Sequence, residues 1–311
     1  MTLPEALDKA SRWALYPVCR GYARRFVKDK PADGVLRSMC RLAFLSVYHY
    51  WPSLKKPRRF AERLWDRMLH DRDPTLTLVS DKFLVRDYVE NKAGPGCLIP
   101  LLWSGGRPED IPYDRLPRRF VIKTNHGCGF NILVPDKTRI DRTAVASRLR
   151  RWLAVNYAED TYLGIAWGYR NIRPVILVEE FLGDAGKPPA DYKFYCFSGR
   201  AEVVTVHLDR YGEKKSSAFT RDFERLRFRP SFRQYPMDVP KPANFEAMVE
   251  LAERLSSGFN FVRVDLYSVD DRIYFGELTP YPVGVSKFIS FDIRDLDRRL
   301  GEKWGANPDW V

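Results

Sequence analysis

Hydrophobic residues recur at helical spacing through the first part of the chain, and the spacing changes to that of strands near residue 118. The segment RRFAERLWDRMLHD (58–71) places its apolar side chains three and four residues apart, which is typical of the buried stripe of a helix. The segment SDKFLVRDYVENKAG (80–94) predicts another helix, with Ser80 or Asp81 as its N-cap and Gly94 after its end. The chain before residue 76 is therefore expected to be helical, and it is also basic.

After residue 118, apolar and polar residues alternate, and six segments predict strands. They are RFVIK (119–123), PVILVEEFL (174–182), DYKFYCF (191–197), AEVVTVHL (201–208), FVRVDLYSV (261–269) and RIYFGELT (272–279). Two helices are expected between them, over 142–159 and 244–258. Strands joined as hairpins, with few helices among them, favour an α+β fold over a doubly wound parallel sheet.

The composition is that of a soluble globular protein, with 311 residues, 45% hydrophobic and 30% charged. At about 150 residues per domain, this length suggests two domains. Charged residues at Glu5, Asp8 and Lys9 interrupt any apolar core of a signal peptide. The five cysteines are scattered without CxxC spacing, which indicates reduced thiols in a cytoplasmic protein and no zinc site. A metal, if one is bound, is then expected to use oxygen ligands.

The net charge of +12, from 52 Lys and Arg against 40 Asp and Glu, has three functional explanations: nucleic acid, an anionic membrane surface or acidic small substrates. No basic cluster belongs to a nucleic-acid-binding motif, and a solvated basic surface explains the charge equally well. The apolar segment LRSMCRLAFLSVYHYW (36–51) could lie on the inner membrane surface or pack on the body of the protein. Packing is favoured, because amphipathic helices usually face a core.

The stretch FVIKTNHGCGFNI (120–132) combines a lysine within an apolar strand, Lys123, with a loop that carries Gly127 and Gly129. A strand-borne lysine followed by such a loop is suited to hold phosphate, because backbone N–H groups and an ammonium group can both face the anion. The sequence contains no GxxxxGK[ST], no GxGxxG opening a helix after a strand and no GxSxG. A P-loop and a Rossmann cofactor site therefore have no support.

Charged residues also lie at equivalent positions on two consecutive predicted strands. Arg263 and Asp265 point to the same face of one strand, and Glu277 and Thr279 share a face of the next. Paired carboxylates without histidines suit Mg²⁺, which takes oxygen ligands and substrate phosphates. A surface hairpin with solvated charges is the alternative interpretation.

Two other strands carry charges whose interpretation is less specific. Asp191 and Lys193 share a face and could meet the same phosphate as Lys123. Glu179 and Glu180 end an apolar strand, as in a hinge that reads an adenine and its ribose. Either pair could equally be solvated.

Asp265 and Glu277 can share a metal ion only if they lie opposite each other in the hairpin. A two-residue turn at 270–271 alone would send them to opposite faces, because a slip of one residue inverts a strand. A three-residue loop over 270–272 brings them together and places Arg272 in the left-handed region. A bulge in either strand, combined with the two-residue turn, would also bring them together.

Taken together, six segments in this order resemble the TupA-like branch of the ATP-grasp proteins, which is named for teichuronopeptide biosynthesis. The resemblance covers about residues 55 to 290. It implies an α+β ATP-grasp fold in which two lobes clamp a nucleotide, with an N-lobe over 76–180, a C-lobe over 181–311 and a basic helical extension over 1–75. The matching segments are RDPTLTLVSDKFLVRDYV (72–89), FVIKTNHGCGFNI (120–132), RPVILVEEFL (173–182), DYKFYCFSG (191–199), FVRVDLY (261–267) and YFGELTPYP (274–282).

The same resemblance implies ATP and Mg²⁺ as cofactors and assigns residues to each of them. Lysines would contact the phosphates, backbone amides of the glycine loop would close over them, and a hinge would hold the adenine. The implied nucleotide-binding residues are Lys82, Lys123, His126, Gly127, Gly129, Asn131, Glu179, Glu180, Phe181, Leu182 and Asp191. The implied metal ligands are Asp265, Glu277 and Thr279, and the implied catalytic residues are Arg263 and Lys193.

The activity implied by the resemblance is that of an ATP-dependent carboxylate–amine ligase that forms an acyl phosphate, in cell-surface polysaccharide or polypeptide biosynthesis. A uronic acid and an acidic amino acid are the expected substrates, which explains the basic charge without nucleic acid. The sequence departs from the family pattern at Thr279, where asparagine is usual, and after Glu277, where only Gly284 remains of a glycine-rich stretch. Two alternatives stay open: a glycosyltransferase, although no DxD motif is found at a strand end and DLD (295–297) lies in an expected helix, and a non-catalytic nucleotide-binding module.

Overall fold

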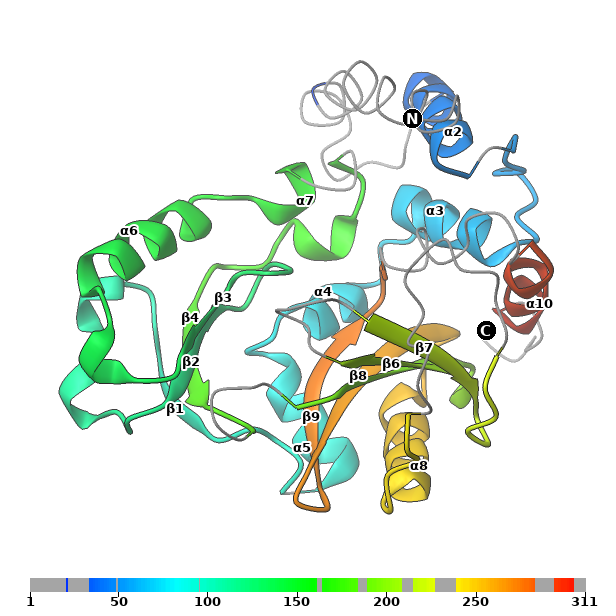
Figure 1. Ribbon diagram of the computed structural model, residues 1–311. Coiled ribbons are helices and arrows are strands. Elements are labelled where there is room, and N and C mark those ends of the chain that lie inside the picture. Colours follow the sequence, from blue (N-terminus) through cyan, green and yellow to red (C-terminus); the bar gives the residue numbers. More distant parts are fainter. Residues whose placement is uncertain are drawn as a thin grey trace.

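The computed structural model describes residues 21, 34–48, 50–94, 96–160, 164–183, 189–208, 215–226, 239–282 and 294–304. Within these ranges the chain forms two antiparallel sheets, with helices between and around them (Figure 1). The expected N-terminal extension covers residues 1–75, and its part before residue 34, apart from residue 21, lies outside the described residues. Gly284 also lies outside them. The α+β class predicted from the sequence is confirmed.

The first sheet has the strand order β1-β4-β2-β3 and carries a helix on one face. Apolar side chains on that face, such as Ile122 and Val178, form a core with Leu149 of the helix. The other face looks toward the second sheet (Figure 1). The elements are β1 (Leu101–Gly105), β2 (Phe120–Thr124), β3 (Asn131–Val134), β4 (Ile176–Glu180), α6 (Arg142–Leu153), α7 (Tyr157–Asp160) and 3₁₀ turns at Pro108–Asp110, Tyr113–Arg115, Lys137–Arg139 and Trp167–Tyr169.

The second sheet has the order β7-β6-β5-β8-β9, and α8 packs on one of its faces. The predicted stripe of α8 is confirmed, because Met248 and Leu255 are buried against Val262 and Val264 of β8. The elements are β5 (Asp191–Phe197), β6 (Arg200–Leu208), β7 (Lys215–Thr220), β8 (Phe261–Val269), β9 (Arg272–Thr279) and α8 (Phe245–Ser256).

Three helices pack at one end of the opposite face of this sheet: α2 (Gly34–Tyr48), α3 (Phe60–His70) and α10 (Arg294–Trp304). The Phe60 ring lies 4.8 Å from that of Phe261 and 5.7 Å from that of Phe197. Phe44 of α2 is buried in the same core, so packing rather than a membrane surface accounts for the apolar stripe of α2. No helix among the described residues is both long and apolar enough to cross a membrane.

Two short helices, α4 (Pro74–Ser80) and α5 (Val85–Ala93), lie between the two sheets (Figure 1). The second begins later than the sequence indicated, because residues 82–84 form a turn. The Asp81 carboxylate accepts hydrogen bonds from the backbone N–H groups of Phe83 (2.8 Å) and Leu84 (3.1 Å), which stabilises that turn before the helix. In α5, the Tyr88 hydroxyl donates to the carbonyl of Leu255 at 2.9 Å, so α5 is attached to α8 of the second sheet.

All six predicted strands are present, whereas β1, β3 and β7 were not predicted. The expected helix over 142–159 ends at Leu153, and a separate turn of helix follows it. Strand β3 has four residues and follows the glycine loop, so its alternation is too short to recognise.

Candidate functional site

One face of the second sheet changes from apolar to polar along the strands β5 and β8. Residues opposite each other on these strands lie on the same face, and the pair Phe197–Phe261 is covered by α3. Further along that face the pair Lys193–Asp265 follows, and Asp191 comes next. Strand alternation therefore places these charged side chains together at the end of the face that the helices leave open.

The β8–β9 hairpin places Asp265 opposite Glu277, as the metal-site hypothesis requires. The register shifts by one residue immediately after this pair, because Leu266 lies opposite Phe275. Gly276 is the extra residue of this β-bulge, and a Cβ atom there would lie only 2.9 Å from the ring of Tyr267. A glycine is therefore needed at the position that sets the carboxylate pairing.

The turn of this hairpin has two residues, Asp270 and Asp271, with φ angles of 49° and 58°. Both values are those of a type I′ turn, the common two-residue connection of a hairpin. The alternative of a three-residue loop is wrong, because Arg272 pairs with Val269 inside the sheet.

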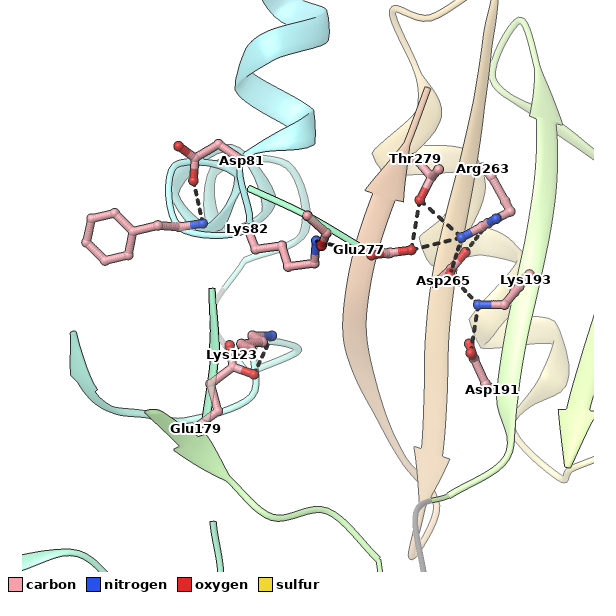
Figure 2. Close-up of polar contacts among 12 residues, drawn as sticks. Asp81, Lys82, Lys123, Glu179, Asp191, Lys193, Arg263, Asp265, Glu277 and Thr279 are labelled. Atoms are coloured by element: carbon pink, nitrogen blue, oxygen red, sulfur yellow. Dashed lines mark hydrogen bonds and ion pairs between the residues drawn. The ribbon is translucent and has the colours of Figure 1, made fainter. Parts of the chain in front are cut away.

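The three predicted metal ligands converge on one atom, Nη2 of Arg263 (Figure 2). This nitrogen donates to Oδ2 of Asp265 at 2.7 Å, to Oε1 of Glu277 at 2.9 Å and to Oγ1 of Thr279 at 3.1 Å. Among the described residues, no group of three or more His, Cys, Asp and Glu side chains could hold a metal ion. Two carboxylates and a hydroxyl that already meet around one cationic group nevertheless fit Mg²⁺, which combines one or two carboxylates with substrate phosphates.

Charges in this cluster are paired and buried. Lys193 contacts Asp265 and also lies 2.7 Å from Oδ2 of Asp191. Burial opposes the charge of Arg263, but the carboxylates of Asp265 and Glu277 outweigh it and raise its pKa well above the ordinary value. Burial raises the pKa of Asp265, against the opposing effect of Arg263 and Lys193.

A cleft with about 680 Å³ of empty space separates the inner face of the first sheet from strands β5, β8 and β9. Its walls include Val121 and Leu133 on one side and Tyr267 on the other, so a flat apolar group could lie between them. None of these three was predicted, although the alternation of β2 places Val121 on the same face as Lys123. The predicted nucleotide-binding residues that line the cleft are Lys123, Asn131, Glu179, Glu180, Phe181, Leu182 and Asp191.

Four of the predicted nucleotide-binding residues do not line the cleft: Lys82, His126, Gly127 and Gly129. The Lys82 ammonium donates to the carbonyl of Gly127 at 2.6 Å and lies 3.6 Å from Oε2 of Glu277, so it bridges the glycine loop and the hairpin (Figure 2). The His126 side chain is buried, with its Nε2 atom 3.0 Å from the carbonyl of Trp152. Burial lowers the pKa of His126, which favours the neutral imidazole.

The carboxylate of Glu179 lies between two cations. Its Oε2 atom lies 2.5 Å from Nζ of Lys123, and its Oε1 atom lies 3.3 Å from Nη1 of Arg86. Arg86 was missed in the sequence. The available signal was its position four residues after Lys82 in a segment expected to be helical, since residues at that spacing on a helix lie on the same face.

A profile of the TupA-like ATPgrasp family matches residues 62–304, which is more than half of the chain. No match was found among curated proteins.

Several solved structures are similar to the chain at low identity. A D-alanine–D-alanine ligase from Bacillus anthracis complexed with ATP is 14% identical, with a TM-score of 0.39 over 67% of this chain and 56% of that one. The chain thus spans little more than half the length of that ligase. The D-cycloserine synthetase DcsG is 13% identical, with a TM-score of 0.44 and coverage of 80% and 81%. The ATP-grasp ligase PsnB, complexed with a phosphomimetic precursor variant, Mg and ADP, is 11% identical, with a TM-score of 0.43 and coverage of 88% and 67%.

Proposed function

Because this chain belongs to the TupA-like ATP-grasp family, we propose that it is an ATP-dependent ligase that joins a carboxylate to an amine. The observation that carries this proposal is the set of charged side chains that line the cleft or lie next to it. Lys123 enters it from the first sheet, and Asp191 enters it from the second, next to Lys193 and the carboxylate pair of the hairpin. Cationic groups for phosphates and oxygen ligands for a metal ion are thereby brought to one gap between two sheets.

ATP would bind with its base between the apolar walls and its phosphates toward the lysines. We assign the phosphates to Lys123 and Lys82, together with backbone amides of the glycine loop at Gly127 and Gly129. The hinge would be formed by Phe181 and Leu182, which follow strand β4 and line the cleft. The two lobes of the clamp would be residues 76–180 and 181–311, and residues 1–75 would be the extension. Helix α3 of that extension contacts the second lobe through Phe60.

Mg²⁺ bound together with ATP would be held by Asp265, Glu277 and Thr279, and it would neutralise phosphate charge. In the proposed reaction, a carboxylate oxygen attacks the γ-phosphorus of ATP, the bond to the bridging oxygen breaks, and ADP leaves. An amine then attacks the carbonyl carbon of the acyl phosphate and loses a proton, and inorganic phosphate leaves as the amide forms.

Three basic side chains would support this chemistry. Lys123 compensates the charge of the transferred phosphate, since positioning and electrostatic stabilisation supply most of the catalysis in such transfers. Arg263 donates hydrogen bonds to the oxyanion of the tetrahedral intermediate, after exchanging part of its carboxylate contacts for the substrate. Lys193 holds Asp265 and Asp191 in place and faces the phosphates.

We propose a uronic acid and an acidic amino acid as substrates, in the cytoplasmic assembly of a cell-surface polysaccharide or polypeptide. The net charge of +12 supports anionic substrates and a peripheral contact with the inner membrane surface. A glycosyltransferase is disfavoured, because neither DxD motif of the sequence lies at a strand end: DRD (71–73) lies between α3 and α4, and DLD (295–297) lies in α10. Asp297 of the second motif is also fully buried and accepts the backbone N–H of Ala61 at 2.8 Å.

The test is ADP release with Mg²⁺ against a panel of acids, each with and without a panel of amines. A ligase releases ADP and phosphate in equal amounts with amide, and only when both an acid and an amine are present. Asp265→Asn should abolish this coupled turnover, whereas Asp222→Asn, on an exposed turn, should not. ATP binding without any acid-dependent turnover would support the non-catalytic module, and sugar transfer from a nucleotide sugar would refute the ligase.

A further inference from the structure

Glu179 lines the cleft, and its buried carboxylate contacts two cations from different parts of the chain. Lys123 reaches it from strand β2 at 2.5 Å, and Arg86 reaches it from helix α5 at 3.3 Å. The Glu179 side chain is only 5% exposed, and those of Lys123 and Arg86 are 15% and 16% exposed. Three charged groups therefore share one largely desolvated position, and only Lys123 and Glu179 line the cleft.

Arg86 has anchors other than Glu179. Its second terminal nitrogen, Nη2, donates to the carbonyl of Ile99 at 2.9 Å. Its helix is attached to α8 through Tyr88 and through Lys92, whose ammonium donates to Oγ of Ser257 at 2.9 Å. Arg86 thus extends from the helix layer of the second sheet to a carboxylate of the first.

A phosphate in the cleft would compete with Glu179 for the single ammonium group of Lys123. Without a second cation, that competition would leave a buried carboxylate unpaired, which is strongly unfavourable. With Arg86 in place, Glu179 keeps a charged partner when Lys123 turns to the phosphate. The presence of Arg86 therefore lowers the free energy needed to release Lys123 to a ligand.

We infer that Arg86 is a positioning residue for nucleotide binding: it holds Glu179 so that Lys123 is free to exchange its carboxylate for a phosphate of ATP. This inference rests on the proposed function, because it needs a nucleotide in the cleft. It predicts a specific dependence between two positions. Loss of Arg86 weakens ATP binding only while residue 179 carries a negative charge that can retain Lys123.

The experiment is isothermal titration calorimetry of ATP with Mg²⁺ on wild type, Arg86→Met, Arg86→Lys, Glu179→Gln and the double variant Arg86→Met/Glu179→Gln. Arg86→Met should weaken ATP binding by roughly tenfold, in the range measured for coupling within one ion-pair network. Arg86→Lys should retain most of the ATP affinity of the wild type, because a lysine keeps the positive charge. In the Glu179→Gln background, Arg86→Met should change the affinity by no more than about twofold, since residue 179 then has no charge to compensate.

A matched control is Arg221→Met, which removes a similar pair with Glu253 (2.8 Å) away from the cleft and should leave ATP affinity unchanged. Thermal unfolding of each variant separates misfolding from weaker binding, and the Arg86→Lys and double variants remain informative if Arg86→Met does not fold. An equal effect of Arg86→Met in both backgrounds, or none in either, would overturn the inference and leave the proposed function standing. Absence of ATP binding by the wild type would overturn both.

Discussion

Asp297 provides a test of the packing of α10 on α3 through the pH-dependence of stability. Its carboxylate accepts the backbone N–H of Ala61 at 2.8 Å, lies 3.3 Å from the Tyr50 hydroxyl and 3.9 Å from Arg59, and is 1% exposed. Burial raises the pKa of Asp297 from its ordinary 3.8 to about 6, with the charge of Glu62 acting in the same direction. The Ala61 hydrogen bond and Arg59 oppose that rise without cancelling it.

The sign of the effect follows from which state holds the proton. Between pH 4 and pH 6 the folded protein keeps a proton on Asp297 that the unfolded chain has lost. The free energy of unfolding therefore falls as the pH rises through this range. A rise from 3.8 to about 6, at about 1.4 kcal/mol for each pKa unit, corresponds to a loss of about 3 kcal/mol by pH 7.

Asp297→Asn removes the ionisation and keeps an oxygen that can accept the Ala61 N–H group. The variant should have nearly the stability of wild type at pH 4 and should exceed it by up to about 3 kcal/mol at pH 7. Urea unfolding followed by tryptophan fluorescence at pH 4, 5, 6 and 7 measures this difference. Asp114→Asn, at a side chain that is 91% exposed, is the control and should change stability little at any of these pH values. A difference between Asp297→Asn and wild type that does not vary with pH would refute the reasoning.

Three further predictions concern the cleft. Lys123→Ala should weaken ATP binding by about 1.5–3 kcal/mol, as expected for a charge-assisted hydrogen bond, and unchanged affinity by calorimetry in a folded variant would remove Lys123 from the site. ATP should raise the unfolding temperature more than GTP, because a hinge backbone at Phe181 and Leu182 would read the adenine edge; equal stabilisation would count against that assignment. Gly276→Ala should destabilise the fold by about 1–3 kcal/mol, because the new methyl group would lie 2.9 Å from the Tyr267 ring, and a variant as stable as wild type in urea would show that the bulge tolerates a side chain.

Alternation along single strands was enough to predict which side chains share a face. Arg263 and Asp265 are two residues apart on β8, and Asp191 and Lys193 are two residues apart on β5, so each pair points to one side whatever the strand packs against. The helical stripe of α8 was predictable for the same reason, since the period of apolar residues is a local property. The order of the six matching segments then resembled one family, which the match over residues 62–304 confirmed.

Pairing between strands was only partly predictable. The sequence allowed two ways for Asp265 to face Glu277, and the tertiary structure selected the two-residue turn with a bulge at Gly276. Gly276 permits the bulge, because it leaves room beside the Tyr267 ring, but the alternation of the two strands is equally compatible with the three-residue loop. The bulge depends on how β9 packs, because Phe275 also receives a backbone contact from outside the hairpin: its N–H donates to the carbonyl of Cys97 at 2.6 Å.

Contacts between distant segments were decided by the tertiary structure alone. Arg86 and Glu179 are far apart in sequence, as are Lys82 and Glu277, and no local period relates their positions. Arg86 reaches Glu179 because α5 packs on the core of the second sheet through Val85 and Val89. Lys82 lies in the turn just before this helix, so the same packing brings it to Glu277. The sequence by itself therefore determined which chemical groups lie on each face, while the assembly of the two sheets determined which charges meet, since burial of distant apolar faces brings them within reach of one another.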